Sequence, residues 1–347
     1  DYFNTTDSLN HIHFIGPSQY GAQLEGSKAF AKAFMQRHNI PTAAYREFTE
    51  ENFEEGVNYL QNHSLPVVLK ADGLAAGKGV VICQSHEEAI AEFGEMIQQS
   101  KFGEASKKVV VEQFLNGIEM SVFILTDGKE YVELPSAKDY KRIGEKDTGL
   151  NTGGMGAVSP VPFADDVFMQ KVRTRIIEPT VAGLEKEKIN YTGFVFIGLI
   201  KVGDEPYVIE YNCRMGDPET EVVMPRLKTN LAELCLAAAE NKLSEAIIET
   251  DNRTAVTIVA VSGGYPGSFE KGYKIELPDM NEKAGSVIFQ AGTKMDGGQL
   301  VTNGGRVLCV TSFGENVKEA VSKSKEVLQE VKFNDMYYRR DIGYEFD

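Results

Sequence analysis

The sequence predicts a multidomain protein of the α/β and α+β classes. Its 347 residues exceed the roughly 250–300 residues at which a single hydrophobic core stops growing. Strand-like and helix-like segments alternate over residues 43–113, which predicts a small α/β module. The segment from residue 251 to the end combines several strands with one clear helix, which predicts a mixed α+β lobe.

The first expected elements are a strand at 11–15 and a helix at 20–38, where Leu24, Ala29, Phe30, Ala33 and Phe34 recur at helical spacing. The expected strand has nothing ahead of it to pair with, and the chain starts at Asp1, so we expect that an upstream segment is missing. The module follows with strands near 43–48, 67–69, 80–83 and 109–114 and helices near 50–62 and 86–99.

Beyond the module, residues 121–126 and 131–134 predict a hairpin around the turn Asp127-Gly128. Residues 135–160 show no periodicity and predict a long polar loop, a kind of segment that is usually functional or disordered. The remaining expected elements are strands near 194–200, 207–211, 254–262, 286–291 and 306–311 and helices near 165–188, 229–240 and 315–331.

Composition excludes several classes of protein. The chain is 42% apolar and 25% charged, far from the composition of a disordered protein. The formal net charge of −15 argues against binding to a nucleic-acid backbone, which requires clustered Lys and Arg. An acidic chain can still hold a local basic pocket for a small phosphorylated ligand.

Cysteine usage and hydropathy indicate a cytoplasmic protein without a membrane segment. The four cysteines are scattered and form no CxxC pair, which favours reduced thiols. No uncharged apolar run reaches 18 residues, and the first residues have neither the basic nor the apolar region of a signal peptide.

A glycine-rich loop at 70–79 combines three glycines with Lys70 and Lys78 between two expected strands. Glycines let backbone N–H groups approach an anion, and the lysines add charge, so the loop predicts a phosphate-binding site. It is not a Walker loop, because three residues separate Gly73 from Gly77 and Gly79 follows Lys78. A tight hairpin with incidental lysines is the alternative.

Two carboxylates lie around the expected strand at 109–114. Glu112 could read the edge of an adenine, and Glu119 could hold ribose hydroxyls. Surface glutamates flanking a strand are the commoner explanation for this pattern.

A sharper pattern lies at the end of the expected strand 207–211. Side chains alternate along a strand, so Glu210 and Asn212 project from one face and Tyr211 from the other. Two oxygen ligands on one strand face suit Mg²⁺, which draws its other ligands from water and phosphates. A solvated strand face is the alternative. Cys213 has no evident histidine base beside it, so we interpret it as a packing residue.

The expected loop also holds basic residues at 138–142, followed by hydroxyl, amide and glycine residues at 147–156. Such a set could bind a phosphorylated or carboxylated substrate, and a plain polar loop is the alternative. Arg306 follows a hairpin-turn sequence at 303–305 and could offer a two-pronged contact to a carboxylate or phosphate.

Taken together and in this order, these segments resemble the ATP-grasp superfamily, and within it the phosphoribosylamine–glycine ligase family. The resemblance runs over essentially the whole chain, and its most family-specific part is 214–219, Arg-Met-Gly-Asp-Pro-Glu, where many members have Phe in place of Met215. It implies an ATP-grasp fold with a small lid subdomain and a mixed C-terminal lobe, and an amino-terminal nucleotide-fold domain mostly absent from this chain. The implied divisions are 1–42 for the remainder of that domain and a connecting helix, 43–113 for the lid, 114–250 for the catalytic core and 251–347 for the C-terminal lobe.

The resemblance also implies roles for individual residues. ATP is assigned to lysines, loop glycines and carboxylates: Lys28, Lys70, Gly73, Gly77, Lys78, Gly79, Glu112, Leu115 through its backbone, and Glu119. Mg²⁺ or Mn²⁺ is assigned to Glu210 and Asn212, and the preceding strand offers no carboxylate as a third ligand. The substrate-binding residues are expected to be Lys138, Asp147, Asn151, Thr152, Gly153, Gly154, Met155, Arg214, Asp217, Glu219 and Arg306. The residues expected to act in catalysis are Lys70, Arg214 and Asp217.

The implied reaction joins glycine to 5-phosphoribosylamine through glycyl phosphate and consumes ATP, as a step of de novo purine biosynthesis. The expected partners are small molecules only, with a monomer as the expected state and fusion to other pathway enzymes left open. Two alternatives stay open: another ATP-grasp ligase that joins a different carboxylate to a different amine, and a non-catalytic nucleotide-binding fragment.

Overall fold

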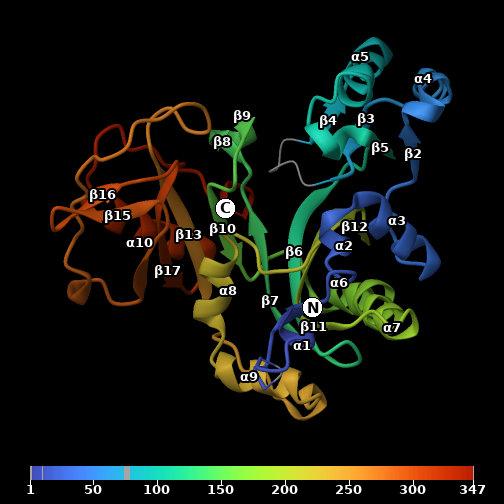
Figure 1. The fold of residues 1–347 in the computed structure, drawn as a ribbon. Helices are drawn as coiled ribbons and strands as arrows, with labels where there is room; N and C mark the ends of the chain where they lie inside the picture. The colour runs from blue at the N-terminus through green and yellow to red at the C-terminus, as the bar shows by residue number, and fades with distance from the viewer. Residues whose placement is uncertain (1, 10, 74–78, 347) are drawn as a thin grey trace. The chain divides into compact units, whose positions relative to one another are not determined.

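The computed structural model describes residues 2–9, 11–73 and 79–346 (Figure 1). It separates into two compact units, which we describe one at a time. Unit 1 comprises Asp1–Glu133, Asp165–Arg214 and Ala232–Ala246, and unit 2 comprises Leu134–Ala164, Met215–Leu231 and Ile247–Asp347. The expected finer divisions at residues 43, 114 and 251 stay predictions.

The larger sheet of unit 1 is built on β11 (Tyr191–Val202), a long strand whose apolar run is buried. It pairs antiparallel with β6 (Ile118–Thr126), β12 (Glu205–Asn212) and the short β1 (Gly16–Pro17). The expected helix at 165–188 forms as α6 (Asp166–Val172), a π-helical turn η4 (Arg173–Ile177) and α7 (Glu178–Lys186). This sheet carries β12, the strand on which the metal ligands were expected.

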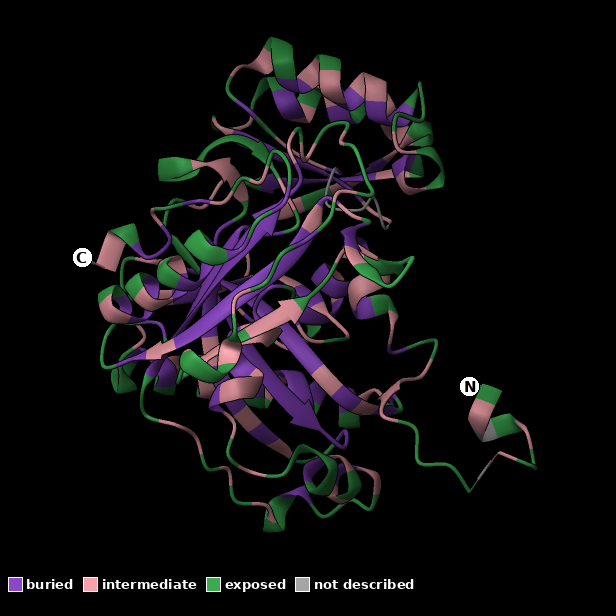
Figure 2. Ribbon diagram, turned by 90° about the vertical axis from the view of Figure 1, so that its left-hand side faces the viewer, coloured by how far each residue is buried: buried purple, intermediate pink, exposed green. Residues whose placement is uncertain are grey.

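A smaller antiparallel sheet of unit 1 has the strand order β2-β5-β3-β4 among the described strands. Its members are β2 (Tyr45–Thr49), β5 (Lys108–Gln113), β3 (Val67–Ala71) and β4 (Val80–Cys83). Helices α4 (Phe53–Gln61) and α5 (His86–Ile97) pack on it and bury Phe48, Phe93 and Val111. Purple buried positions alternate with exposed ones along α5 in Figure 2, as its amphipathic sequence predicts. The glycine-rich loop connects β3 to β4.

The expected helix at 20–38 is split in two. It forms α2 (Gln23–Gly26) and α3 (Lys28–Arg37), separated by Ser27, whose side chain accepts a hydrogen bond from the Phe30 N–H. An N-cap of this kind starts a new helix, which the apolar spacing alone did not reveal. The expected strand at 11–15 is wrong: only Gly16 and Pro17 pair with β11, and Ile12 and Phe14 are exposed.

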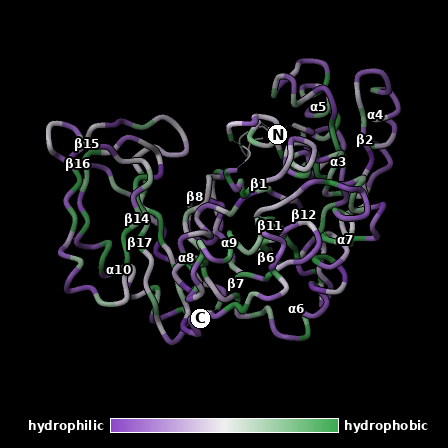
Figure 3. Tube along the Cα trace, turned by 60° about the horizontal axis from the view of Figure 1, so that its bottom comes forward, coloured by the Kyte–Doolittle hydropathy of each residue, from purple (hydrophilic) through white to green (hydrophobic). Residues whose placement is uncertain are grey.

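The main sheet of unit 2 has β13 (Thr254–Val261) between β10 (Gly156–Ser159) and β17 (Arg306–Gly314). The strand β14 (Ser286–Gln290) pairs with β17, and β7 (Tyr131–Asp139) pairs with β10 at residues 138 and 139. Helix α10 (Val317–Glu330) packs on this sheet over a core that includes Val256, Val310 and Leu328. Hydrophobic stretches, green in Figure 3, run through β17.

Residues 135–160 are not the expected loop without regular structure. They contain the end of β7, the hairpin β8 (Arg142–Gly144) and β9 (Thr148–Asn151), and β10. The expectation failed because all four residues of β9 are exposed, so this strand has no alternation of apolar and polar residues to detect.

The remaining described elements are short. They are α1 (Tyr2–Thr5), η1 (Glu50–Asn52), η2 (Gly103–Lys107), η3 (Glu145–Asp147), α8 (Thr220–Arg226), α9 (Leu231–Ala239), η5 (Leu243–Glu245), η6 (Met280–Glu282), β15 (Thr293–Asp296), β16 (Gln299–Thr302) and η7 (Tyr344–Phe346). Over the described ranges, no helix has both the length and the apolar character that crossing a bilayer requires.

Candidate functional site

A cavity of about 300 Å³ lies within unit 1, at the small end of the range of ligand pockets. It is lined by residues of α2, α3, β3, β5 and β12 and of the segments that follow them. The lining residues are Leu24, Glu25, Lys28, Ala31, Lys32, Met35, Lys70, Gly79, Val80, Glu112, Ile209, Glu210, Tyr211, Asn212 and Arg214. Most of the residues expected to bind the nucleotide and the metal are therefore brought together from positions nearly two hundred residues apart.

The start of the glycine-rich loop is attached to the N-terminus of α3 through Asp72. The Asp72 carboxylate accepts hydrogen bonds from the Ala29 N–H at 2.7 Å and from Ser27 Oγ at 3.0 Å. Its carbonyl oxygen accepts from the Lys28 N–H at 3.1 Å. A carboxylate at this place is favoured by the positive end of the helix dipole. These bonds hold Lys28 beside the loop.

Two expected phosphate-binding lysines point into the cavity. Lys28 Nζ donates to the Gly73 carbonyl at 3.2 Å, and burial lowers the pKa of Lys28. Lys70, on β3, is buried; its Nζ lies 3.0 Å from Glu112 Oε2 and 3.4 Å from the Ile209 carbonyl. Gly73 and Gly79 flank the loop, whereas Gly77 and Lys78 lie outside the described residues.

Glu112 is a buried carboxylate of β5, only 3% exposed. Its Oε2 is shared by two ammonium groups, Lys70 Nζ and Lys32 Nζ, each at 3.0 Å. Among the described residues, its other oxygen, Oε1, is buried without a hydrogen-bond partner. A buried acceptor left without a donor is costly, so this oxygen is an unsatisfied polar atom of the site.

Glu210 and Asn212 both line the cavity from β12. Gly198 lies opposite Glu210 on β11, and a Cβ at Gly198 would come within 3.3 Å of the Glu210 side chain, so the glycine keeps this side clear. Tyr211 is buried, with its hydroxyl 2.8 Å from Thr180 Oγ1. The two oxygen-bearing side chains fit a hard divalent cation such as Mg²⁺. Among the described residues, no group of three or more His, Cys, Asp and Glu side chains forms a metal site.

Arg214 follows β12 and also lines the cavity. Its guanidinium donates to Glu25 Oε1 at 3.2 Å and to Asn212 Oδ1 at 3.3 Å. The Cys213 N–H donates to Glu25 Oε2 at 2.8 Å, and burial raises the pKa of the Cys213 thiol, so this cysteine is not poised as a nucleophile. Glu25, which sequence reasoning did not select, thus fixes both residues.

Two expected nucleotide contacts are placed elsewhere. Leu115 lies just after β5 and is half-buried, and Glu119 is exposed on β6 beside Ile200 of β11. Neither belongs to the described lining of the cavity. Their assignment to adenine and ribose stays a prediction.

A second group of expected residues meets within unit 2. Arg306 Nη2 donates to Asp217 Oδ2 at 2.8 Å, and Nη1 donates to the Gly153 carbonyl at 2.8 Å. Gly154 has a φ of +116°, and a Cβ there would lie 2.3 Å from Pro218, so only glycine fits. The structure therefore joins the start of β17, the turn after β9 and the segment before α8.

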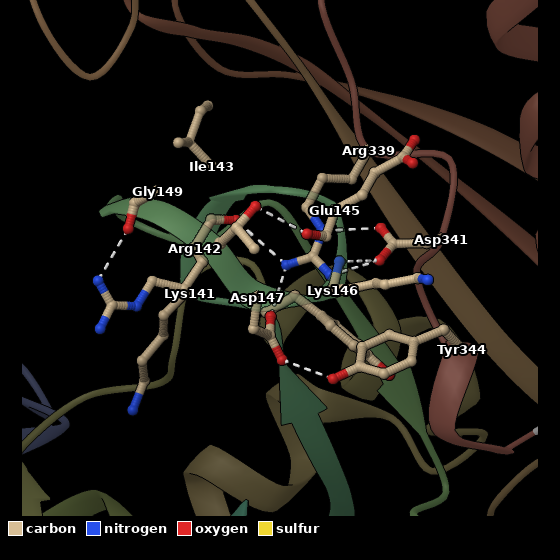
Figure 4. Close-up of polar contacts among 12 residues, drawn as sticks. Lys141, Arg142, Ile143, Glu145, Lys146, Asp147, Gly149, Arg339, Asp341 and Tyr344 are labelled. Carbon is tan, nitrogen blue, oxygen red and sulfur yellow. Dashed lines mark hydrogen bonds and ion pairs between the residues drawn. The ribbon is translucent and has the colours of Figure 1, made fainter.

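Lys138 and Asp147 contact the C-terminal segment. Lys138 Nζ lies 2.7 Å from Glu345 Oε1. Asp147 accepts from Arg339 Nη1 at 2.6 Å and from the Tyr344 hydroxyl at 3.1 Å, as Figure 4 shows. Their charged groups hold the chain end against residues 138–147 in the structure, and their assignment as substrate ligands stays a prediction.

The other expected substrate residues differ in exposure. Met155 is fully buried with Val259 and Cys309, and its N–H and carbonyl both bond backbone groups. Its assignment to substrate binding stays a prediction. Asn151 is exposed on β9. The N–H and the hydroxyl of Thr152 both donate to the Lys141 carbonyl. Glu219 is buried at the start of α8.

Sequence reasoning missed Lys32, although a signal was present. It lies four residues after Lys28 on the same helix, a spacing that places two side chains on one face. The apolar pattern of the helix concealed it, because Lys32 falls among the buried positions Ala31, Phe34 and Met35. A lysine buried in this way requires a partner, and Glu112 supplies it.

Two family models match the chain. The model of the phosphoribosylglycinamide synthetase ATP-grasp (A) domain matches residues 26–220, and that of the phosphoribosylglycinamide synthetase C domain matches residues 255–345. The phosphoribosylamine–glycine ligase of Escherichia coli (strain K12) is 47% identical over 336 residues, which are 96% of this chain and 78% of that protein. The enzyme of the same name from Vibrio cholerae is 47% identical over 334 residues, 96% of this chain and 77% of that protein.

Solved structures agree with this relationship. The crystal structure of phosphoribosylamine–glycine ligase from Thermotoga maritima has a TM-score of 0.86 and 38% identity, covering 94% of this chain and 81% of that one. The biotin carboxylase domain of Hydrogenobacter thermophilus 2-oxoglutarate carboxylase, in complex with MgADP, ADP and bicarbonate, shares the fold with a TM-score of 0.72 at 17% identity, over 95% and 71% of the two chains. The chain therefore belongs to the phosphoribosylamine–glycine ligase family and has the ATP-grasp fold expected from its sequence.

Proposed function

We propose that this chain joins glycine to 5-phosphoribosylamine at the cost of ATP, giving glycinamide ribonucleotide, ADP and phosphate, a step of de novo purine biosynthesis. The observation that carries the proposal is the unit 1 cavity. Lys28 and Lys70 line it together with Glu210 and Asn212, and the chain belongs to the phosphoribosylamine–glycine ligase family. We further propose that the chain acts in the cytoplasm as a monomer on small molecules, with no nucleic-acid partner.

In this proposal the cavity binds ATP. Lys28 and Lys70 contact the phosphates beside the start of the glycine-rich loop. The start of that loop is already fixed to α3 through Asp72. Glu112, which lines the cavity, reads the edge of the base, and a carboxylate favours adenine because the amino group of adenine is a donor. Leu115 and Glu119 remain proposed contacts to adenine and ribose.

Glu210 and Asn212 would hold Mg²⁺ or Mn²⁺, since both offer oxygen and line the same cavity as the lysines. When bound, the metal would neutralise phosphate charge and stabilise the charge that develops during transfer. Arg214 donates to Asn212 Oδ1 and so orients the amide oxygen of this ligand.

Unit 2 supplies the proposed substrate contacts, which are Asn151, Thr152, Gly153, Gly154, Asp217, Glu219 and Arg306. Arg306 is the strongest candidate for an anionic group, because its fork can exchange a carbonyl partner for a carboxylate or phosphate. Asp217, its present partner, would then be free to accept from an amine. Arg214, in unit 1, is proposed separately as a substrate contact.

The reaction needs little covalent help from side chains. Glycine carboxylate attacks the γ-phosphorus of ATP and ADP leaves; the amine then attacks the carbonyl of glycyl phosphate, and phosphate leaves as the amide forms. Bringing two unit charges to 4 Å costs about 4 kcal/mol at an effective dielectric constant near 20. Each 1.4 kcal/mol removed from the barrier gives about a tenfold faster reaction. In the proposal, Lys28 and Lys70 screen this repulsion.

The test is release of ADP in a mixture of ATP, Mg²⁺, glycine and phosphoribosylamine, with one component left out at a time. We expect ADP only from the complete mixture, with the Escherichia coli relative as a positive control. ADP release without phosphoribosylamine, or with another amine in its place, would refute the proposed substrate. Tight ADP binding without any turnover would instead favour the non-catalytic alternative.

A further inference from the structure

Tyr265 is a half-buried residue of unit 2 that the proposed function does not use. Its hydroxyl oxygen accepts a hydrogen bond from the Gly153 N–H at 3.0 Å. The carbonyl of the same glycine accepts from Arg306 Nη1 at 2.8 Å. Tyr265 and Arg306 therefore bind the two polar groups of one exposed residue in the turn after β9. Arg306 is the residue already proposed to bind an anion.

The ring of Tyr265 is fixed by the segment that carries Arg306. A Cβ at Gly305 would lie 2.2 Å from Tyr265 Cδ2, so the ring packs directly on this glycine. Ser262 holds the same segment, because its N–H donates to the Gly305 carbonyl at 2.8 Å and its hydroxyl donates to the Gly304 carbonyl at 2.9 Å. The Tyr265 N–H donates to the Ser262 carbonyl at 3.1 Å. The phenol therefore needs little further ordering before a ligand binds.

The hydroxyl of Tyr265 also has an unused donor. A phenol donates one hydrogen bond and accepts others. Its oxygen accepts from Gly153, and across the described residues its proton has no acceptor. The two bonds at Gly153 lie at the exposed surface, so a ligand can reach the groups that form them. One neutral donor and one cationic donor thus lie beside the same glycine.

We propose that the Tyr265 hydroxyl binds the 5′-phosphate of phosphoribosylamine, together with Arg306. The inference rests on the proposed function and adds a contact to its substrate site. A phosphate accepts several hydrogen bonds, and an arginine fork beside a hydroxyl supplies them. The 5′-phosphate is unchanged from substrate to product, whereas the carboxylate of glycine is the group that reacts with ATP. Neither Tyr265 nor Arg306 belongs to the described lining of the unit 1 cavity, where that reaction is proposed, so this pair suits the group that does not react.

The alternative is that the hydroxyl only supports the turn at Gly153. Its loss would then disturb every ligand of this turn, whether phosphorylated or not. A direct bond to the phosphate predicts a loss confined to ligands that carry the phosphate. Hydrogen bonds to a charged group are about twice as strong as neutral ones, so we expect loss of the hydroxyl to weaken binding about tenfold.

The experiment compares the wild type with Tyr265→Phe, which keeps the ring on Gly305 and removes only the hydroxyl. Tyr337→Phe is the matched control, because it removes a hydroxyl of the same unit that donates to the Ile143 carbonyl at 3.0 Å. KM is measured for each of the three substrates on the full chain. Tyr265→Phe should raise KM for phosphoribosylamine about tenfold and leave KM for ATP and for glycine within about twofold. Tyr337→Phe should leave all three values within about twofold.

Two inhibitors distinguish a phosphate contact from support of the turn. Inhibition by glycinamide ribonucleotide, the proposed product, is compared with inhibition by the riboside that lacks its phosphate. Tyr265→Phe should raise the inhibition constant of the ribonucleotide about tenfold and that of the riboside less than twofold. In the wild type the ribonucleotide should inhibit at least tenfold more strongly than the riboside, and this comparison does not depend on the folding of any variant.

The outcomes separate this inference from the proposed function. An unchanged KM for phosphoribosylamine in Tyr265→Phe, equal losses for ribonucleotide and riboside, or equal inhibition by both in the wild type would overturn the phosphate contact while ligase activity stands. A rise in KM for glycine alone would overturn it too, because the hydroxyl would then bind the carboxylate. A wild type without ligase activity would refute the proposed function and, with it, this inference.

Discussion

Arg339 offers the sharpest test of how unit 2 is held together. Its side chain is fully buried and donates to Asp341 Oδ1 at 2.9 Å, to Asp341 Oδ2 at 3.0 Å and to Asp147 Oδ1 at 2.6 Å. It also donates to the Arg142 carbonyl at 3.2 Å. Figure 4 shows the guanidinium between the carboxylates of Asp147 and Asp341. The perturbation we consider is Arg339→Met, which keeps much of the volume and removes every donor.

The expected loss follows from the two carboxylates left behind. Removing one partner of a buried ion pair costs about 3–5 kcal/mol. The Asp147 side chain is 38% exposed and that of Asp341 is 15% exposed, so water compensates Asp147 in part. We therefore expect the lower end, about 3 kcal/mol in the free energy of unfolding of unit 2. With a urea m value of about 3 kcal/mol per molar, the midpoint falls by about 1 M.

A second consequence concerns the turn between β8 and β9. Lys146 and Asp147 have φ values of +54° and +53°, a conformation that non-glycine residues seldom adopt. Asp341 Oδ2 accepts from the Lys146 N–H at 2.5 Å, and Arg339 holds the Asp147 side chain. Without Arg339 this turn should relax, so hydrogen exchange at residues 142–149 should accelerate more than exchange in β13.

The assay is urea unfolding of both proteins followed by a probe in unit 2, together with the exchange measurement. Arg253→Met is the matched control, because it breaks an arginine–aspartate pair of the same unit whose arginine side chain is 48% exposed. Exposed pairs contribute about 0–1 kcal/mol, so the control should lose no more than that. A loss below about 1 kcal/mol in Arg339→Met, or equal losses in the two variants, would refute the reasoning.

Three further outcomes are expected. Glu210→Gln should lower turnover by about a hundredfold or more while the fold survives, because it weakens the proposed metal site rather than the core; near-normal ADP release at saturating Mg²⁺ would rule out the assignment. Lys70→Met should weaken both ATP binding and turnover, as measured by calorimetry and ADP release, and unchanged values would exclude the phosphate role. Burial raises the pKa of Asp341, but hydrogen bonds from Arg339 and the Lys146 N–H outweigh it and lower that pKa overall. A depressed carboxyl pKa stabilises the fold above its ordinary value and loses that effect as the pH falls, so the stability of unit 2 should drop below about pH 4. The drop should be smaller in Asp341→Asn, and equal acid profiles would contradict this origin.

Local patterns in the sequence predict much of the fold. The strands β3 and β4 and the helix α5 lie where apolar spacing and turn residues indicated, because each packs against a neighbour close in sequence. The strand expected at 11–15 shows the limit of this reasoning. Pairing depends on a partner strand, and the residues of one segment do not specify that partner.

The candidate site divides in the same way. Glu210 and Asn212 were predictable because one strand fixes both side chains relative to each other. The partners of Asp147 were not, since Arg339 lies 192 residues away in sequence and Tyr344 lies 197 residues away. Contacts between residues so far apart in sequence depend on how the chain packs after β17 and α10. The spacing of residues 147–156 does not predict them.

The charges that line the unit 1 cavity explain why nucleotide binding would need a metal. The described lining sets four cations, Lys28, Lys32, Lys70 and Arg214, against the three anions Glu25, Glu112 and Glu210. Two of the cations are committed to Glu112 in the structure, and Arg214 is committed to Glu25. One net positive charge cannot balance a triphosphate in a partly desolvated site. A divalent cation at Glu210 would therefore be required for tight binding. The affinity for ATP measured without added metal then reports how much Lys28 and Lys70 contribute to binding alone.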